Sequence, residues 1–300
     1  MSQSHIPKVV VVGHDGRDGG DIALEAALGL HERFQATVIV VHGLDLPAPK
    51  DIAGRPDEIE LMRTGACERV ERDLAARLER RLGATSEGVE LAVFPGSAAS
   101  AIAEVARARK ADLLVLGPHR KDGPLDFGRT TRAVLAATRC DVWMQPRAPE
   151  PLARVIVPYD GSDESARGLA LGLEFARQHG VGLTLLQAYS PPDFAYPSPD
   201  GSEVLMPMYV IEQQRTALRE RFEASVAALD ARGVALDHRF LDGDPASVIQ
   251  DEQGPRDLVV MGTHGRTGLA AALLGGVAAA VLKHAQGPVL AVRAHGRFED

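Results

Sequence analysis

The sequence has few of the residues that support disulfide-rich, zinc-binding or nucleic-acid-binding proteins. Its two cysteines, Cys67 and Cys140, are far apart and form no CxxC pair. A disulfide framework or zinc knuckle is therefore unsupported, and a reducing compartment is expected. The net charge is −8, because 41 acidic residues outnumber 33 basic ones. Without a basic surplus the chain lacks the electrostatic footprint of a DNA- or RNA-binding protein, so we expect no nucleic-acid partner.

Long hydrophobic runs are also missing. The long stretch without charged or strongly polar side chains, residues 268–282, has 15 residues and contains three glycines. A membrane-spanning helix needs ~20 apolar residues. The apolar run near the N-terminus, residues 9–12, is too short for a signal peptide. We therefore expect a cytoplasmic protein with no membrane partner.

Several motifs of catalytic and phosphate-binding sites are absent. The sequence has no G-x-x-x-x-G-K-[ST] loop and no G-x-G-x-x-G following a strand. It also has no H-E-x-x-H zinc motif and no G-x-S-x-G nucleophile turn. We therefore predict no catalytic residue and no protein metal ligand.

The segment from residue 258 to residue 292 carries the most specific pattern. It contains a short apolar run at 258–261, a glycine-paced loop, an Ala/Val/Leu helix and a second apolar run at 289–292. Glycines let backbone N–H groups approach an anion closely, and the amides of a helix's first turn point toward it. This order of elements predicts a phosphate-binding cradle. The alternative is that the glycines only allow the helix to pack closely on a sheet.

The chain is an internal repeat with a period near one domain length. Asp15-Gly16 follows a valine run, and Asp160-Gly161 follows a similar run 145 residues later. The proline-rich segment 146–151 separates the two copies and suits a stiff linker. We therefore predict one domain at 1–147 and a second at 152–300.

Apolar runs alternate with helical patterns in both copies, which predicts parallel, doubly wound sheets. The expected strands are 9–12, 37–41, 90–94, 113–116 and 142–145, then 155–158, 183–188, 235–241, 258–261 and 289–292. The expected helices include 21–34, 57–82 and 98–110, then 210–232 and 245–250. A further helix is expected after the strand at 155–158, capped by Ser162 or Asp163 and ended by Gly180 or Gly182. The span 189–208, with five prolines, is predicted to be a surface lid or a disordered loop.

Asp160 lies just after the first strand of the second copy, beside the expected ligand crevice. Its carboxylate could accept hydrogen bonds from a ribose or an adenine amino group. The alternative is that Asp160 only caps the turn before the next helix. Ser162 is predicted to be a helix cap rather than a nucleophile.

The spacing G-x2-G-x9-G, formed by Gly262, Gly265 and Gly275, resembles that of the universal stress protein family, as do the surrounding MGTHGRTGL and GPVL segments. The resemblance covers nearly the whole chain, with one match in each copy of the repeat. It implies two tandem five-stranded α/β domains of three layers, similar to the adenine nucleotide alpha hydrolase fold. Nucleotide-binding members carry Ser or Thr where this chain has Gly276. Gly276 has two interpretations. It either keeps the anion-binding amide and loses only a hydroxyl hydrogen bond, about 1–2 kcal/mol, or marks a copy that no longer needs nucleotide. We favour retained, weakened binding.

The resemblance implies binding of ATP, or AMP or ADP, with Mg²⁺ as an optional companion, in the second domain. The predicted binding residues are Pro158, Tyr159, Asp160, Ala188, Met261, Gly262, Thr263, His264, Gly265, Arg266, Gly275, Gly276, Val277 and Ala278. The first domain departs from the pattern at Pro118, Arg120 and Arg129, so no such site is expected there. At the position that corresponds to Asp160, the first domain also has an aspartate, Asp15.

The final strands of the two copies, 142–145 and 289–292, are expected to pair within the chain as an intrachain pseudo-dimer. Whether two chains then form a homodimer stays open. The leading functional prediction is a non-enzymatic nucleotide-binding regulator of the stress response. The alternatives are a weak ATPase or phosphotransferase using Arg266 and Mg²⁺, and a ligand-free scaffold for protein contacts.

Overall fold

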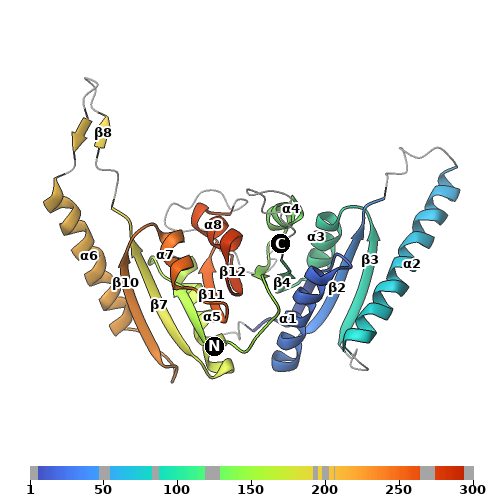
Figure 1. Ribbon diagram of the computed structural model, residues 1–300, viewed down its shortest axis with the longest axis horizontal. Coiled ribbons are helices and arrows are strands. Elements are labelled where there is room, and N and C mark those ends of the chain that lie inside the picture. The colour runs from blue at the N-terminus through green and yellow to red at the C-terminus, as the bar shows by residue number, and fades with distance from the viewer. Residues whose placement is uncertain are drawn as a thin grey trace.

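The computed structural model describes residues 6–46, 55–82, 88–118, 129–191, 195–197, 203–205, 207–263 and 274–293. In these residues a ten-stranded sheet carries helices on both faces, and two further strands form a separate hairpin (Figure 1). Each half contributes five parallel strands, which confirms the predicted tandem, doubly wound α/β/α architecture. None of the described helices combines the length and apolarity needed to cross a membrane.

The two halves follow the same order of elements. The first contains β1 (Val9–Gly13), α1 (Asp18–Phe34), β2 (Thr37–Leu44), α2 (Pro56–Leu82), β3 (Val89–Pro95), α3 (Ala98–Ala108), β4 (Leu113–Leu116), α4 (Arg129–Ala137) and β5 (Asp141–Met144). The second contains β6 (Arg154–Pro158), α5 (Asp163–His179), β7 (Gly182–Tyr189), β8 (Ala195–Pro197), β9 (Glu203–Leu205), α6 (Met208–Ala227), β10 (Leu236–Asp242), α7 (Pro245–Glu252), β11 (Asp257–Gly262), α8 (Gly276–His284) and β12 (Val289–Val292). The strand order is β10-β7-β6-β11-β12-β5-β4-β1-β2-β3.

Continuous burial explains why the central strands consist almost entirely of valine, leucine and isoleucine. Strands covered on both faces read as apolar runs rather than alternating patterns. One hydrophobic cluster packs α1 and α5 against one face of the sheet, and a second packs α3, α7 and α8 against the other. Phe175 and Phe222 are the largest fully buried side chains, and both belong to the first cluster.

Local sequence signals fix the ends of α5 as expected. The Ser162 hydroxyl accepts a hydrogen bond from the Ser165 N–H at 3.2 Å, which confirms the predicted cap. At the other end Gly180 is left-handed, with φ of 64°, a conformation that glycine adopts without a steric penalty. Helix α5 therefore begins directly after the end of β6 and Asp160.

The halves join through their last strands. Strands β12 and β5 pair antiparallel, with Leu290 opposite Trp143, so the expected intrachain pairing is present. Trp143 is buried and packs at 5.7 Å from the Phe175 ring, as a core residue. Because the two strands run in opposite directions, the carboxyl ends of the two strand sets point in opposite directions at this junction.

Two predictions for the second half need correction. The span 189–208 is not simply a lid or a disordered loop, because β8 and β9 pair antiparallel in it and project beyond the start of α6 (Figure 1). Helix α6 ends at Ala227 rather than near Arg232. The Asp230 carboxylate accepts from the Arg232 N–H at 3.0 Å, and Gly233 has a φ of 81°, so a turn replaces the last expected helical turn.

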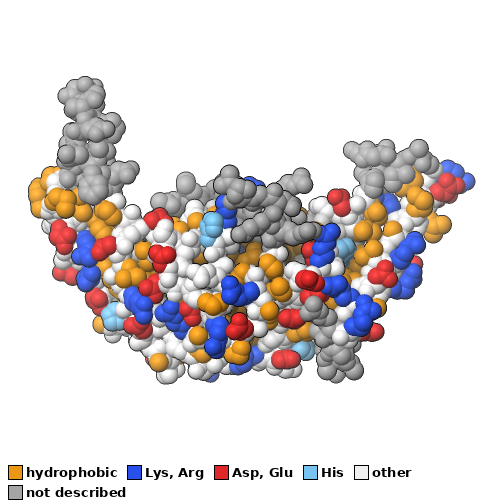
Figure 2. Space-filling model, viewed as in Figure 1, with side chains coloured by type: hydrophobic (Ala, Val, Ile, Leu, Met, Phe, Trp, Pro, Cys, Tyr) orange, Lys and Arg blue, Asp and Glu red, His pale blue; other side chains and the backbone are white. Residues whose placement is uncertain are grey.

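The starting ends of α2 and α6 expose apolar side chains. Leu61 and Met62 on α2 are 75% and 62% exposed, and Met208 and Tyr209 on α6 are 69% and 73% exposed. In Figure 2 hydrophobic side chains gather at both outer ends of the molecule, over these two helices. Exposed apolar clusters of this kind often mark sites of contact with other molecules.

Candidate functional site

The candidate site is a cavity of about 240 Å³ in the second half. It lies where β6, β7 and β11 end and α8 begins, the position at which doubly wound sheets bind ligands. The residues that line it are Pro158, Tyr159, Asp160, Ser165, Leu186, Ala188, Pro245, Ile249, Met261, Gly262, Thr263, Gly275, Gly276, Val277 and Ala278.

Eleven of the fourteen predicted binding residues are brought together in this cavity. The other three, His264, Gly265 and Arg266, lie outside the described residues. The roles of all fourteen in binding stay predictions, although their proximity follows from the fold.

Sequence reasoning missed four residues that line the cavity: Ser165, Leu186, Pro245 and Ile249. One of them could have been found, because Leu186 lies two positions before Ala188 and alternate residues of a strand face the same side. Pro245 and Ile249 belong to α7, whose position over the crevice is a tertiary feature. No local pattern in the sequence indicates it.

One side of the cavity is apolar. Leu186 and Met261 are 1% and 4% exposed, and Ile249 and Ala188 continue the same surface. A flat, weakly polar ring such as a nucleobase fits surroundings of this chemistry, because such a site gains from apolar burial and needs few polar groups. The predicted contact of Ala188 with a base therefore falls on the apolar side.

Asp160 caps the turn before α5 and also lines the cavity. Its Oδ1 accepts hydrogen bonds from the Ser162 N–H at 3.0 Å and from the Ser162 hydroxyl at 2.6 Å. The same side chain lines the cavity and is half-buried. The turn-capping interpretation is therefore correct as a structural statement, and it holds the carboxylate in place at the edge of the crevice.

The opposite side of the cavity is the N-terminus of α8. Gly275 is its N-cap and donates its N–H to the Thr263 carbonyl at 2.8 Å, while the Ala279 N–H bonds back to Gly275 at 2.9 Å. Helix geometry gives the amides of the first turn, from Gly276 to Ala278, no acceptor within the helix. These amides and the positive end of the helix dipole favour an anion at this point.

Gly276 stands at the position where the resemblance implies Ser or Thr. A Cβ built on Gly276 would meet no heavy atom of the described residues within 4 Å. Close packing against the described part of the chain therefore does not require this glycine.

The equivalent crevice of the first half has a different interior. A cavity of about 310 Å³ lies there, bordered by His14, Asp15 and Pro118. His14 is 3% exposed, and its Nδ1 accepts the Gly16 N–H at 2.9 Å. The proton therefore resides on Nε2, which donates to Asp21 Oδ1 at 3.2 Å.

Burial, rather than a nearby charge, dominates the behaviour of His14. It lowers the pKa of the imidazole below its usual value, although the Asp21 carboxylate opposes the shift. Arg77 pairs with Asp21 Oδ2 at 2.5 Å and compensates the buried carboxylate. The result is a neutral histidine held in a closed polar network at the base of the crevice.

Comparison with known proteins then identifies the chain. The family model described as "Universal stress protein family" matches residues 7–146 and again residues 152–293. The chain belongs to the universal stress protein family. The resemblance stated from the glycine spacing is thereby confirmed.

Individual members of the family align with either the whole chain or one half. A universal stress protein of Mycobacterium tuberculosis is 24% identical over 311 residues and covers 98% of this chain and 99% of its own length. One from Methanocaldococcus jannaschii is 31% identical over 142 residues, covering 47% of this chain and 81% of its own. A crystal structure of a universal stress protein from Archaeoglobus fulgidus superposes with a TM-score of 0.62 at 17% identity, covering 95% of this chain and 98% of that one. At this identity the match establishes the fold alone.

Within the described part of this family member, no group of three or more His, Cys, Asp or Glu side chains is arranged to hold a metal ion.

Proposed function

We propose that the protein is a non-enzymatic regulator that binds ATP, or the related AMP or ADP, in the crevice of its second half. The observation that carries the proposal is the meeting of an apolar pocket, the Asp160 carboxylate and the free first turn of α8 in one cavity. These are the three chemistries that a base, a ribose and a phosphate require, in that order along the ligand.

In this proposal each part of the cavity has one task. The base lies against Leu186 and Ile249, and the ribose hydroxyls donate to Asp160. The phosphates accept hydrogen bonds from the amides of Gly276 and Val277, as anions do at helix N-termini. Mg²⁺, when present, would neutralise phosphate charge.

The first half is proposed to bind no such nucleotide. Pro118 offers no backbone N–H at the position after β4, and His14 with Asp21 occupies the base of that crevice. We therefore expect one nucleotide per chain rather than two.

Purified protein provides the test. Small molecules released on denaturation are identified by mass spectrometry, and calorimetry with nucleotide-free protein gives the stoichiometry. One adenine nucleotide per chain, with a rise in melting temperature on adding ATP, is the expected result. No released nucleotide and no shift at millimolar ATP would contradict the proposal, and sustained release of phosphate would favour the ATPase alternative.

A protein-contact role is the second candidate. The observation in its favour is the exposure of Leu61, Met62, Met208 and Tyr209 at the outer ends of the molecule. Such a scaffold would bind its partner equally well with and without ATP, whereas a nucleotide-dependent regulator would not.

A further inference from the structure

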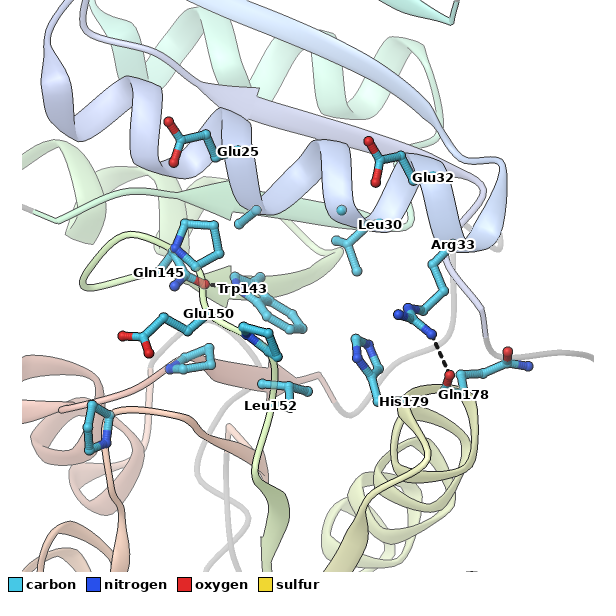
Figure 3. A pocket seen from close by; sticks show the side chains of 16 residues that line it. Glu25, Leu30, Glu32, Arg33, Trp143, Gln145, Glu150, Leu152, Gln178 and His179 are labelled. Carbon is cyan, nitrogen blue, oxygen red and sulfur yellow. Dashed lines mark hydrogen bonds between the residues drawn. The ribbon is translucent and has the colours of Figure 1, made fainter. Parts of the chain in front are cut away.

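A second cavity lies at the junction of the two halves, away from both crevices. Its volume is about 650 Å³, within the range of ~300–1,000 Å³ that is usual for small-molecule sites. Helix α1 forms one wall, and the last residues of α5 with the linker between the halves form the other (Figure 3).

Part of the lining of this interdomain cavity is apolar and includes an aromatic side chain. Trp143, Leu30 and Leu152 line it, together with Pro149, Pro151, Pro255 and Pro288. The Trp143 indole N–H already donates to Gln145 Oε1 at 2.9 Å, so the indole has only its apolar ring to offer a ligand. Figure 3 shows Trp143 lying between Leu30 on α1 and Leu152 on the linker.

One polar atom on the wall has no partner among the described residues. His179 is the last residue of α5, and its ring stacks on Phe175 at 6.2 Å. Its Nε2 is buried, and no atom in the described part of the chain forms a hydrogen bond with it. Burial, with the nearby Arg33 guanidinium, lowers the pKa of His179 to about 4, so the imidazole is neutral at neutral pH. Buried polar atoms are nearly always hydrogen-bonded, and an unpaired one in a cavity wall suits a ligand group.

The charges around the cavity are mostly negative. Among the described residues that line the cavity, Glu25, Glu32 and Glu150 carry carboxylates and Arg33 carries a guanidinium. Glu25 also takes part in another interaction. That guanidinium donates to the Gln178 carbonyl at 2.5 Å and is held at one end of the cavity. A concave site with a negative rim concentrates cations and repels anions.

We propose that the interdomain cavity binds a small organic cation with an apolar body. Its ammonium N–H donates to His179 Nε2, and its apolar part lies against the ring of Trp143. The neutral imidazole of His179 adds no charge that would oppose the ammonium. This ligand is positively charged, whereas the nucleotide proposed for the second-half crevice is negatively charged.

The chain carries its own reporter for this site, because Trp143 is its single tryptophan. Three probes of similar shape separate charge from apolar burial: 2-phenylethylammonium, 2-phenylethanol and phenylacetate. Trp143 emission is followed during each titration and repeated with saturating ATP. The cation should change the emission saturably and bind at least about tenfold more tightly than phenylacetate, a difference of ~1.4 kcal/mol. Equal affinities for cation and anion, or no saturable change with any probe, would overturn the proposal.

Two variants locate the binding. Gly29 lines the cavity, and a Cβ there meets nothing within 4 Å, so Gly29→Leu should fill the space without disturbing the fold. Gly65→Leu is the matched control, since Gly65 lies in α2 with equally open surroundings. We expect Gly29→Leu to weaken the cation at least about tenfold and Gly65→Leu to leave it unchanged.

His179→Phe tests the nitrogen alone. The equivalent position at the end of α1 is Phe34, which packs on the same Phe175 ring at 5.5 Å, so a phenyl group is compatible with this core. The variant should bind 2-phenylethylammonium about tenfold more weakly while its affinity for 2-phenylethanol stays unchanged. Undiminished cation binding in both His179→Phe and Gly29→Leu would place the probe elsewhere and overturn the assignment.

Discussion

The crevices of the two halves start from the same backbone and differ in what fills them. At the end of the first strand one half has His14 and the other Tyr159. His14 bonds to Asp21, whose equivalent in the second half, 145 residues later, is Ala166. A buried ionic network therefore stabilises one crevice, while the other keeps its polar groups at the mouth. The difference indicates that the fold supplies a cavity in each half and that a few side chains determine its chemistry.

Glycines also have different roles in the two crevices. A Cβ on Gly117 would lie 1.9 Å from the Gly19 carbonyl oxygen, so this glycine is needed for packing α1 on the end of β4. A Cβ on Gly276 meets no atom of the described residues within 4 Å. Close packing therefore explains the first glycine, and packing against the described part of the chain does not explain the second.

The largest expected effect comes from breaking the buried network of the first half. Asp21→Ala copies the residue at the equivalent position. It removes the acceptor of His14 Nε2 and the buried partner of Arg77, which keeps only its exposed pair with Asp18 at 3.1 Å. We expect a loss of about 3 kcal/mol in the free energy of unfolding, measured by urea denaturation. Asp18→Ala on the same helix is the control, because Asp18 is 91% exposed and should show no measurable change. If the additional change His14→Tyr recovers none of the loss, the two crevices differ by more than this network.

A charge placed in the second crevice should abolish its proposed ligand. Gly276→Asp has room for its side chain and favours the start of α8, so folding should be retained. Its carboxylate would repel phosphate, and we expect at least about a 100-fold loss of ATP affinity by calorimetry, or ~2.7 kcal/mol. Arg129→Asp makes the corresponding change in the first half. Equal losses from both substitutions would remove the distinction between the crevices.

Adding at position 276 the hydroxyl that the resemblance implies should increase the difference in ATP affinity between the two crevices. Gly276→Ser adds one hydrogen-bond donor beside the first-turn amides, in space that is open. We expect ATP affinity to rise about fivefold to tenfold, since a hydrogen bond of this kind contributes ~1 kcal/mol. The enthalpy of binding should become more favourable with it. Gly276→Ala, which adds the Cβ without the oxygen, should give no gain; an equal gain from Ala would assign the effect to helix stability.

The smallest effect concerns pH. The pKa of His179 falls from 6.5 to about 4 on folding, so the unfolded chain takes up this proton at higher pH. Stability is therefore lost as the pH drops from about 6.5 toward 4. His179→Phe should give a shallower decline in melting temperature across this window, and His14, whose pKa is also lowered, should account for part of the remaining slope. A decline as steep as in the parent protein would show that His179 is not protected from protonation.

The sequence was informative where one local rule determined the outcome. Valine and leucine runs alternating with helical patterns predicted the ten strands of the sheet, and Ser162 and Gly180 marked the ends of α5. The glycine spacing predicted that Gly262 and Gly275 border the same cavity. It could not indicate that Pro245 and Ile249 of α7 close the cavity, because their approach depends on how α7 packs on α8 and β7.

The polar network and the interdomain cavity were also beyond local reasoning. His14, Asp21 and Arg77 are separated by up to 63 positions and meet only after α1 and α2 pack on the sheet. The end of α6 was misplaced because the Asp230–Gly233 turn competes with an otherwise helical pattern. In each case tertiary contacts or turn chemistry override the periodicity.

The antiparallel pairing of β5 with β12 joins two halves of a single polypeptide, and it limits what a substitution can do. In an assembly of two identical chains each change is present on both sides of the symmetry axis, so damage to one crevice is damage to both. Here a change is made once, and the backbone ladder that holds the halves together does not depend on it. The linker also keeps the two strands at high effective concentration, so dilution does not separate them. The sequence of one half can therefore change without the same change occurring in the crevice of the other half.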